Sequence, residues 1–327
     1  MLRQIPSDAV RVMPDPLREM AAAIFRRIGL PDADSKFIAD CLVQVDLRGV
    51  FSHGTRQIRG YARLYQTGGL NPRPNIRVLR ETPISAYLDG DGGIGYLVAA
   101  RAAEMAIEKA GKAGIAIAGT RNNGHAGSMG IYARMALPHG LVTFCVAGGS
   151  GWQPPAEPDA NVWDAMKAPP MCFGIPSADG PPLVFDMNTS MFRGREQVEE
   201  AMRRFPDALI KSMGLKFVST LIGGVLAGTV PVEERRGDFH AAIRGFLIVA
   251  FSPDLFGDAE GFGREVARII ASSRALNPLP GFDTAEVPGS PEWQRERDWA
   301  REGIPLGTEH RGLLEEVAES LEVEAPW

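Results

Sequence analysis

The chain is poor in cysteine and carries no excess of positive charge. Only three cysteines occur in 327 residues, each within an apolar run and widely spaced from the others. This spacing offers no framework for disulfide bonds or a zinc site, and it favours buried free thiols. The formal net charge is −5. Since binding to nucleic-acid phosphates needs a basic surface, no nucleic-acid partner is expected.

Long apolar segments are also scarce. Residues 1–16 contain charges and prolines but no apolar stretch of the kind found in secretory signals, so a cytoplasmic location is expected. The one long apolar segment, 213–230, is interrupted by Lys216 and is rich in small residues in its second half. We therefore predict a buried helix there and expect no membrane partner.

Several catalytic motifs are missing as well. The chain has no P-loop, no H-E-x-x-H, no paired C-x-x-C and no G-x-S-x-G, which argues against the chemistries that depend on them. His53, His125 and Asp46 could in principle hold a metal ion, but such long separations support a metal site only weakly, and we predict none. What is present, 45% apolar and 23% charged residues, is ordinary for a soluble globular protein.

Apolar periodicity divides the chain into helical ends and a strand-rich middle. Helical spacing is found at 15–30, 34–47 (with Asp34 or Ser35 as the cap), 55–66, 261–276, 291–301 and 312–321. Short apolar runs predict strands at 84–88, 114–118, 141–147, 171–175, 183–186 and 246–251, with helices at 95–113, 127–135, 196–205 and 215–228. We expect a helical domain from 1–75 and 256–327, and a mixed-sheet domain from 76–255.

The segment D-L-R-G-V-F-S-H-G-T-R at 46–56 concentrates an acid, two arginines, a serine and a histidine. If Ser52 caps a helix, His53 and Arg56 share one of its faces and point at one small site. A guanidinium holds a carboxylate through two parallel hydrogen bonds, and an imidazole transfers protons because it titrates near neutrality. A capped surface helix with an incidental histidine is an equally weighted alternative.

A second candidate segment, R-N-N-G-H-A-G-S-M-G-I-Y at 121–132, lies between a predicted strand and a predicted helix. Loops at strand ends commonly form sites, and the glycines around His125 would let a ligand approach the backbone. The chain has only five histidines. Because His53 and His125 both fall in such segments, a functional pair is favoured over a glycine-rich turn with an exposed histidine.

Two further patterns are ambiguous. Residues 90–95 match G-x-G-x-x-G between a predicted strand and a predicted helix, as in dinucleotide-binding sites. The acid expected near the ribose is missing, although Arg121 would suit NADP, and a tight glycine turn is the preferred interpretation. Residues 182–190 end a strand in Asp186, Asn188 and two hydroxyls. This set could hold a ribose or a nicotinamide amide, or could simply cap the strand.

Together these segments resemble a family of NAD(P)-dependent oxidoreductases that includes one class of malate and L-lactate dehydrogenases. Segment 46–56 is similar to its D-x-R-G-x-x-S-H-G-x-x-R, 122–132 to its N-x-x-H-x-G-x-x-G-x-Y, and 186–190 to its D-M-A-T-S. Softer similarities follow at 211–228, 288–291 and 302–306. The resemblance therefore runs almost from end to end.

The resemblance implies a fold of the α/β (α+β) class. A non-Rossmann mixed-sheet cofactor domain is inserted in a helical domain, as in L-sulfolactate dehydrogenase, and two copies usually form a homodimer with each active site near the interface. It also weakens the case for a dinucleotide fingerprint at 90–95, because the family has a strand, a glycine-rich turn and a helix there.

The resemblance assigns site residues as well. His125 or His53 is expected to donate and accept the proton. Arg56 is expected to bind the substrate carboxylate, with Arg48 and Ser52 in the same motif. The positions expected near the cofactor, NAD or NADP, are Asp186, Met187, Asn188, Lys211 and Gly289.

We therefore predict hydride transfer between NAD(P) and C2 of a small 2-hydroxy, 2-oxo or 2-imino carboxylic acid. Departures from the family pattern lie at 147–149, 167–170 and 210–213, and the segment 191–210 is short. They motivate an alternative: a protein of this fold that binds a small acid or a cofactor but lacks dehydrogenase activity.

Overall fold

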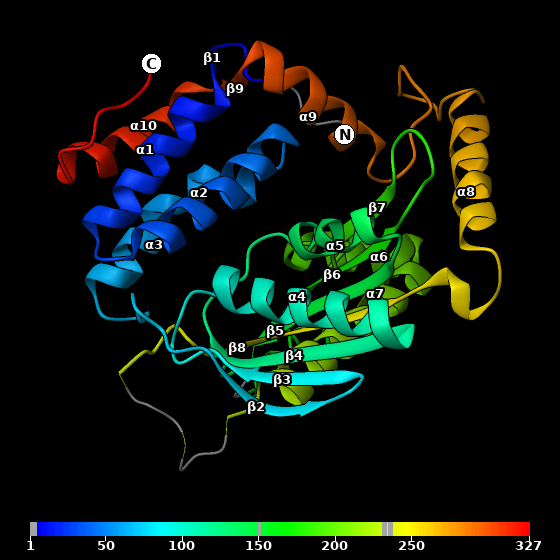
Figure 1. The fold of residues 1–327 in the computed structure, drawn as a ribbon, viewed down its shortest axis with the longest axis horizontal. Helices are drawn as coiled ribbons and strands as arrows, with labels where there is room; N and C mark the ends of the chain where they lie inside the picture. Colours follow the sequence, from blue (N-terminus) through cyan, green and yellow to red (C-terminus); the bar gives the residue numbers. More distant parts are fainter. Residues whose placement is uncertain (1–4, 150–151, 231–233, 235–237) are drawn as a thin grey trace.

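A seven-stranded mixed sheet lies at the centre of the chain (Figure 1). The computed structural model describes residues 5–149, 152–230, 234 and 238–327. The strands run in the order β2-β3-β4-β8-β5-β6-β7. Their bounds are β2 (Arg77–Thr82), β3 (Ser85–Asp89), β4 (Ile115–Asn123), β5 (Val142–Gly149), β6 (Pro170–Ile175), β7 (Leu183–Asn188) and β8 (Arg244–Phe251).

Helices surround the sheet and connect its strands. The α-helices are α1 (Pro14–Arg27), α2 (Asp32–Leu47), α3 (Ile58–Gln66), α4 (Gly95–Ala113), α5 (Gly130–Ala136), α6 (Gly194–Arg204), α7 (Pro206–Ser219), α8 (Ala259–Arg274), α9 (Ser290–Glu302) and α10 (Thr308–Ser320). Shorter 3₁₀-helices are η1 (Phe51–His53), η2 (Thr55–Gln57), η3 (Leu137–His139) and η6 (Pro253–Leu255), and η4 (Thr220–Leu226) is a π-helix that continues α7.

Only one pair of neighbouring strands in this sheet is parallel. β3 and β4 run in parallel and are joined by α4, whereas the other neighbouring pairs are antiparallel. A Rossmann fold needs a mostly parallel sheet, so this topology excludes it. The glycines at 90–95 form the turn from β3 into α4, and Arg121 pairs with Asp89 and Glu234. The preferred interpretation of a glycine turn is thus confirmed.

Helices from both ends of the chain form a second layer beside the sheet (Figure 1). In that view α1, α2, α3, α9 and α10 lie together. The short strands β1 (Val10–Val12) and β9 (Ile304–Leu306) pair antiparallel and tie the two ends together. α10 packs against α3, and α9 packs against α2. Segments far apart in the sequence therefore build one layer.

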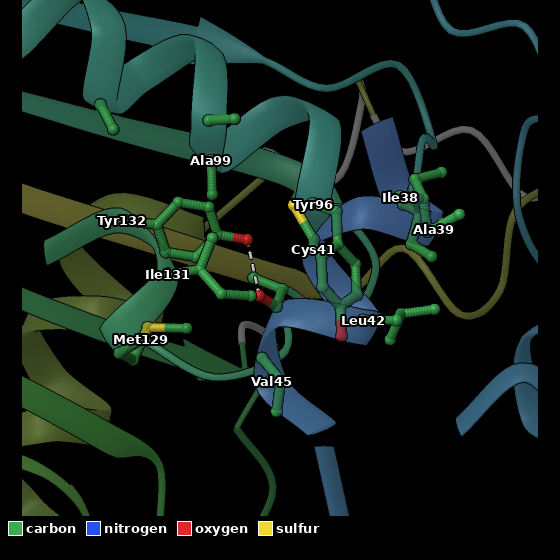
Figure 2. Close-up of a cluster of buried hydrophobic side chains, with 14 of the residues drawn as sticks. Ile38, Ala39, Cys41, Leu42, Val45, Tyr96, Ala99, Met129, Ile131 and Tyr132 are labelled. Carbon is green, nitrogen blue, oxygen red and sulfur yellow. Dashed lines mark hydrogen bonds between the residues drawn. The ribbon is translucent and has the colours of Figure 1, made fainter. Parts of the chain in front are cut away.

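A shared apolar core joins the helical layer to the sheet. Figure 2 shows Cys41 and Leu42 of α2 beside Tyr96 of α4 and Tyr132 of α5. Both tyrosines are fully buried. The hydroxyl of Tyr132 donates to the backbone oxygen of Ala126 at 2.6 Å, so the polar end of its ring is satisfied inside the core. This packing sets the position of α2 and hence of the turn that follows it.

α7 and η4 cover the opposite side of the sheet from α4 and α5. A Cβ at Gly223 or Gly224 would overlap the backbone of 147–149 in β5, so only glycine permits this close approach. The segment 213–230 is helical over most of its length, as predicted, but its outer side is exposed at Leu221 and Val225. Within the described residues, one helix, Pro206–Leu226, has the length and apolar composition of a membrane-spanning segment.

The six predicted strands are all present, but an edge strand was not predicted. β2 pairs only with β3 in the sheet. All of its side chains except the last are exposed. An edge strand with so little burial lacks the alternation of apolar and polar residues on which strand prediction depends.

Two predicted helix beginnings are wrong. α2 begins before Asp34 and Ser35, and Ser35 is buried within its first turn, where its hydroxyl donates to the oxygen of Pro31 at 2.9 Å. Ser52 caps no helix. η1 and η2 are separate turns on either side of Gly54, and α3 follows them. The expected helical face shared by positions 53 and 56 therefore does not exist.

Candidate active site

A cleft of about 1620 Å³ is lined by both the helical layer and the sheet. Its walls come from the end of α2 and the following turn, the loop between β4 and α5, the ends of β5 and β7, and the segment leading into α9. Pockets for small ligands usually occupy roughly 300–1,000 Å³. This cleft therefore has room for a small substrate together with a dinucleotide.

His125 lies on the loop between β4 and α5 and is held by a tyrosine. Its Nδ1 is 2.6 Å from the hydroxyl of Tyr61 on α3, which is itself 3.3 Å from the hydroxyl of Tyr96. Burial raises the pKa of Tyr61, so the phenol stays neutral, and its oxygen can accept a hydrogen bond from the Nδ1–H of His125. The contact with Tyr61 leaves Nε2 of His125 as the nitrogen available to a ligand.

The glycine turn between β3 and α4 supports the same loop. The N–H of Gly95 donates to the carbonyl of His125 at 3.1 Å, and the N–H of Gly124 donates to the carbonyl of Gly93 at 2.8 Å. A Cβ at Gly95 would overlap the backbone of Gly124 and Ala126. The pattern that resembles a dinucleotide fingerprint serves here to position a histidine.

His53 reaches the cleft from the turn after α2. The centroid of its ring is 6.0 Å from that of His125, and its Nδ1 is 3.0 Å from the hydroxyl of Ser52. All three residues line the cleft. Gly54 follows directly and packs on the carboxylate of Asp46, where a Cβ would overlap it. The structure thus brings together His53, His125 and Ser52, as the sequence predicts.

A buried polar chain of Asp46, Thr55 and His310 lies next to this turn. Thr55 donates its backbone N–H and its hydroxyl to one oxygen of Asp46, at 3.0 and 2.5 Å, and its Oγ1 is 2.9 Å from Nε2 of His310. Burial raises the pKa of Asp46 to about 7. Burial, with a contribution from Arg56, lowers the pKa of His310 to about 4. These contacts connect the turn that carries His53 to α2 and α10. Asp46 therefore holds this turn in place without lining the cleft itself.

The two predicted carboxylate ligands are placed differently from one another. Arg56 is exposed, is ion-paired with Glu309 of α10 and does not line the cleft. Arg48 lines the cleft, but its side chain is buried and is held by Glu296 of α9 through bonds of 3.0 and 2.9 Å. One nitrogen of Arg48, Nη1, is buried without a hydrogen-bond partner among the described residues.

Asp186 and Asn188, at the end of β7, both line the cleft. Asp186 accepts the hydroxyl of Ser128 at 2.6 Å and the N–H of Gly130 at 2.8 Å. It therefore fixes the other end of the loop that carries the catalytic candidate. The side-chain oxygen of Asn188 accepts the N–H of Ser190 at 2.7 Å, which is the local cap that the sequence left open as an alternative.

Of the three remaining residues that were predicted to lie near the cofactor, one lines the cleft and two do not. Gly289 lines the cleft and has a φ of +92°, a conformation that favours glycine. Met187 packs on the other side of β7 in a separate apolar cluster, and Lys211 is exposed on α7; neither lines the cleft. Further along the same helix, Lys216 does line the cleft, with its ammonium 3.9 Å from the ring centroid of Trp163.

Positive charge gathers around His125. Burial, followed by the charges of Arg244 and His53, lowers the pKa of His125 to about 3. Arg244 begins β8 and lines the cleft. Solvent reaches its side chain, while the surrounding protein lowers its pKa through desolvation. The imidazole of His125 is therefore neutral near pH 7, the form that accepts a proton from a hydroxyl group.

Polar groups in the cleft wall fit a nicotinamide dinucleotide. Oγ1 of Thr220 on η4 is buried there without a hydrogen-bond partner among the described residues, as is Nη1 of Arg48. Lys216 adds a positive charge that suits a phosphate. Across the described parts of the chain, no group of three or more His, Cys, Asp or Glu side chains is placed to hold a metal ion.

The sequence did not indicate a role in the site for three residues. Arg244 and Lys216 line the cleft, and Tyr61 contacts His125. Tyr61 lies at helical spacing among apolar residues and has the pattern of a core residue. Arg244 precedes a predicted strand, so it has the pattern of a solvated strand end. Lys216 did give a signal, because it interrupts an apolar segment, but the sequence offers no indication of what it faces.

Comparison with known proteins identifies the family to which this geometry belongs. The family model for malate/L-lactate dehydrogenase matches residues 12–207 and 194–314. The chain is 27% identical to a malate dehydrogenase of Pyrococcus horikoshii over 96% of both proteins. It is 25% identical to an L-sulfolactate dehydrogenase of Methanocaldococcus jannaschii over 94% of this chain and 96% of that protein. A malate dehydrogenase of Pyrococcus abyssi is 35% identical over 187 residues, 57% of this chain and 51% of that protein.

Solved structures agree with the sequence comparisons. The malate dehydrogenase of Pyrococcus horikoshii superposes with a TM-score of 0.83 at 25% identity, covering 99% of each chain. The sulfolactate dehydrogenase of Methanocaldococcus jannaschii gives a TM-score of 0.77 at 22% identity, covering 97% of this chain and 98% of that one, a likeness of fold. Fold and cleft together define a non-Rossmann α/β protein of oxidoreductase type. The chain belongs to the malate/L-lactate dehydrogenase family, which confirms the predicted family and fold class.

Proposed function

We propose that this protein is an NAD(P)-dependent oxidoreductase that transfers a hydride between its cofactor and C2 of a small carboxylic acid, interconverting a 2-hydroxy acid with its 2-oxo acid or reducing a 2-imino acid to its 2-amino acid. The observation that carries the proposal is the pair of imidazoles, His53 and His125, with ring centroids 6.0 Å apart in one large cleft. Relatives named malate, sulfolactate and ureidoglycolate dehydrogenase act on hydroxy acids by name, which supports the same class of substrate here.

The residues of the chain supply binding and proton transfer, and a bound nicotinamide supplies or accepts the hydride. In the oxidising direction Nε2 of His125 takes the proton of the C2 hydroxyl while the hydride leaves C2. In the reducing direction the same nitrogen returns the proton to the C2 oxygen or nitrogen. Tyr61 orients the imidazole through Nδ1, and His53 and Ser52 line the cleft next to it.

We propose Asn188, Gly289 and Thr220 as neighbours of the cofactor, since all three line the cleft and Thr220 has an unused hydroxyl there. Asp186 has a different role, because its carboxylate is occupied in holding the loop of His125. The cofactor is NAD or NADP, and a comparison of the two reduced forms in one assay decides between them.

The exposed apolar side of α7 and η4 supports a homodimer. Ile210, Val218, Leu221 and Val225 lie on this side and are 42–55% exposed. Soluble monomers rarely leave a continuous apolar surface of this kind in water, and a two-fold axis would pair the surface with its own copy. We propose a cytoplasmic homodimer. The three cysteines, all free and buried, suit a reducing compartment.

Turnover tests the proposal. The purified protein is screened with 2-oxo acids and cyclic imine carboxylates, and the loss of NADH or NADPH is followed by absorbance. Replacement of the proton-transfer group in His125→Ala is expected to lower kcat by about 10²–10⁴-fold. His139→Ala serves as the matched control, because His139 is exposed and does not line the cleft.

Two results would count against the proposal. Quenching of NADH fluorescence without turnover of any acid would favour the alternative, a cofactor-binding protein of this fold without dehydrogenase activity. An unchanged kcat in His125→Ala would remove that histidine from the mechanism.

A further inference from the structure

Arg244 lines the same cleft as His125, and its charge contributes to the low pKa of that histidine. As the first residue of β8 it pairs with Asn123 of β4 on one side and with Gly149 of β5 on the other. Alternate residues of a strand share a face, so Arg244 lies on the same face as Phe246, whose ring packs on Tyr132 of α5. This is the face covered by α5 and by the loop that precedes it.

Gly149 leaves open space beside Arg244. Directly opposed residues of antiparallel strands project to the same face, yet position 149 has no side chain, and a Cβ there would meet nothing within 4 Å. Both residues line the cleft. A ligand can therefore approach the guanidinium from the side of β5.

The other arginines considered as anion ligands are already paired. Glu296 holds Arg48, and Glu309 holds Arg56. Among the residues that the structure describes, no carboxylate is recorded in an ion pair with Arg244, and the one group that favours its charged form is Tyr61, a neutral phenol. The cleft thus holds a guanidinium whose natural partner, a carboxylate, is not supplied by the described part of the chain.

We propose that Arg244 binds the carboxylate of the substrate, the role that the sequence assigned to Arg56. This inference rests on the proposed function and specifies how that site recognises its acid. A planar guanidinium holds a carboxylate through two parallel hydrogen bonds. Held in this way, C1 of the acid is fixed and the C2 oxygen is presented to Nε2 of His125. Arg244 itself forms and breaks no covalent bond.

Carboxylate binding at Arg244 also changes His125. After burial, the charge of Arg244 is the largest cause of the low pKa of His125, and the other groups that face the imidazole are His53 and Tyr61. A carboxylate on Arg244 neutralises this charge, so the pKa of His125 rises when the acid binds. The imidazole then holds more firmly the proton that it takes from the C2 hydroxyl.

The test compares Arg244→Gln and Arg244→Lys with the wild type. Binding of oxamate, a non-reactive analogue of a 2-oxo acid, is titrated by calorimetry with NADH or NADPH present. We expect Arg244→Gln to weaken oxamate on the order of 100-fold and to raise KM more than it lowers kcat, since a charged anchor is lost. Arg244→Lys should recover part of the affinity. Arg59→Gln is the control, because Arg59 pairs with Glu316 away from the cleft.

A pH profile separates binding from a purely structural role. For oxidation of the 2-hydroxy acid, the acid limb of kcat/KM in Arg244→Gln should lie at a higher pH than in the wild type, because a positive charge that lowers the pKa of His125 has been removed. Loss of packing alone would lower activity without moving this limb.

The outcomes distinguish this inference from the proposed function. Unchanged oxamate affinity in Arg244→Gln overturns it, as does a loss of affinity seen in Arg56→Gln instead. Failure of the wild type to bind oxamate also overturns it. If the wild type binds oxamate through Arg244 but turns over no acid, the anion site stands and the dehydrogenase proposal fails.

Discussion

At the scale of single residues, the site depends on hydrogen bonds that orient its imidazoles. The N–H of Gly95 donates to the backbone carbonyl of His125, and the hydroxyl group of Tyr61 forms a hydrogen bond with Nδ1 of its imidazole ring. Neither partner is close to His125 in the sequence. An imidazole in an open cleft would otherwise rotate, and proton transfer needs a fixed direction.

Removal of the Tyr61 hydroxyl should therefore impair turnover without unfolding the protein. We expect Tyr61→Phe to lower kcat about 10–100-fold, because Nδ1 of His125 loses its partner and the ring is no longer held. Steady-state kinetics measures the effect, and thermal melting monitors the fold. Tyr65→Phe, on the next turn of α3, is the control. Equal kcat values in the two variants would refute the orienting role of Tyr61.

A second prediction at this scale concerns Asp46 and pH. Burial raises the pKa of Asp46 in the folded protein to about 7, from an ordinary value of 3.8. For an acid whose folded pKa is raised, stability is greatest below the unfolded pKa and is lost as pH rises through the folded one. Between pH 5 and pH 8 this group alone should lower the free energy of unfolding by roughly 2–3 kcal/mol.

Asp46→Asn removes this titration. Urea unfolding at pH 5 and pH 8 should show the variant gaining stability relative to the wild type at the higher pH. Other groups that titrate nearby, such as His310, are present in both proteins, so the comparison cancels much of their effect. A stability difference that does not change with pH would show that Asp46 stays ionised in the folded state.

At the scale of elements, the contact between η4 and the sheet is made by backbone rather than side chains. Gly223 and Gly224 lie against 147–149 of β5, and Gly228 lies against Gly245 of β8. This close approach places Thr220 in the wall of the cleft. A π-helix in this position fits the tendency of such turns to occur at functional sites.

Alanine substitutions on this helix should have opposite effects. In Gly224→Ala the new methyl would overlap the carbonyl oxygen of Gly149, and we expect a loss of about 1–3 kcal/mol of stability. In Gly214→Ala, within α7, nothing lies within 4 Å of the new methyl, and helix propensity should raise stability by about 0.5–1 kcal/mol. Urea midpoints measure both. Equal destabilisation by the two substitutions would contradict the packing described here.

At the scale of the whole molecule, the outer side of α7 and η4 should decide the oligomeric state. Leu221→Lys places a charge at its centre, and we expect the protein to become a monomer in light scattering coupled to size exclusion, because burying an unpaired ammonium is costly. Val78→Lys, at an exposed apolar position of the edge strand β2, is the matched control. Dissociation by Val78→Lys alone would place the interface at the sheet edge instead.

Much of the fold could be predicted from local patterns. α4 has the predicted bounds, and six predicted strands are present, because apolar runs bounded by glycine and proline depend on neighbours in the sequence. The turn at Gly54 could not be predicted, since it depends on contact with the Asp46 carboxylate. The division of the chain into two domains stays a prediction, as one apolar cluster includes residues of both layers.

The sequence by itself determined the family and the two histidine segments, because their motifs consist of residues close together in the chain. Only the tertiary structure decided which arginine has a charge that acts on His125. Arg56, close to His53 in the sequence, is drawn to Glu309 on α10, whereas Arg244 is brought beside His125 by the pairing of β8 with β4. Chain spacing sets which residues share an element, but the partner of a charge is set by the packing of distant elements, and no local pattern records it.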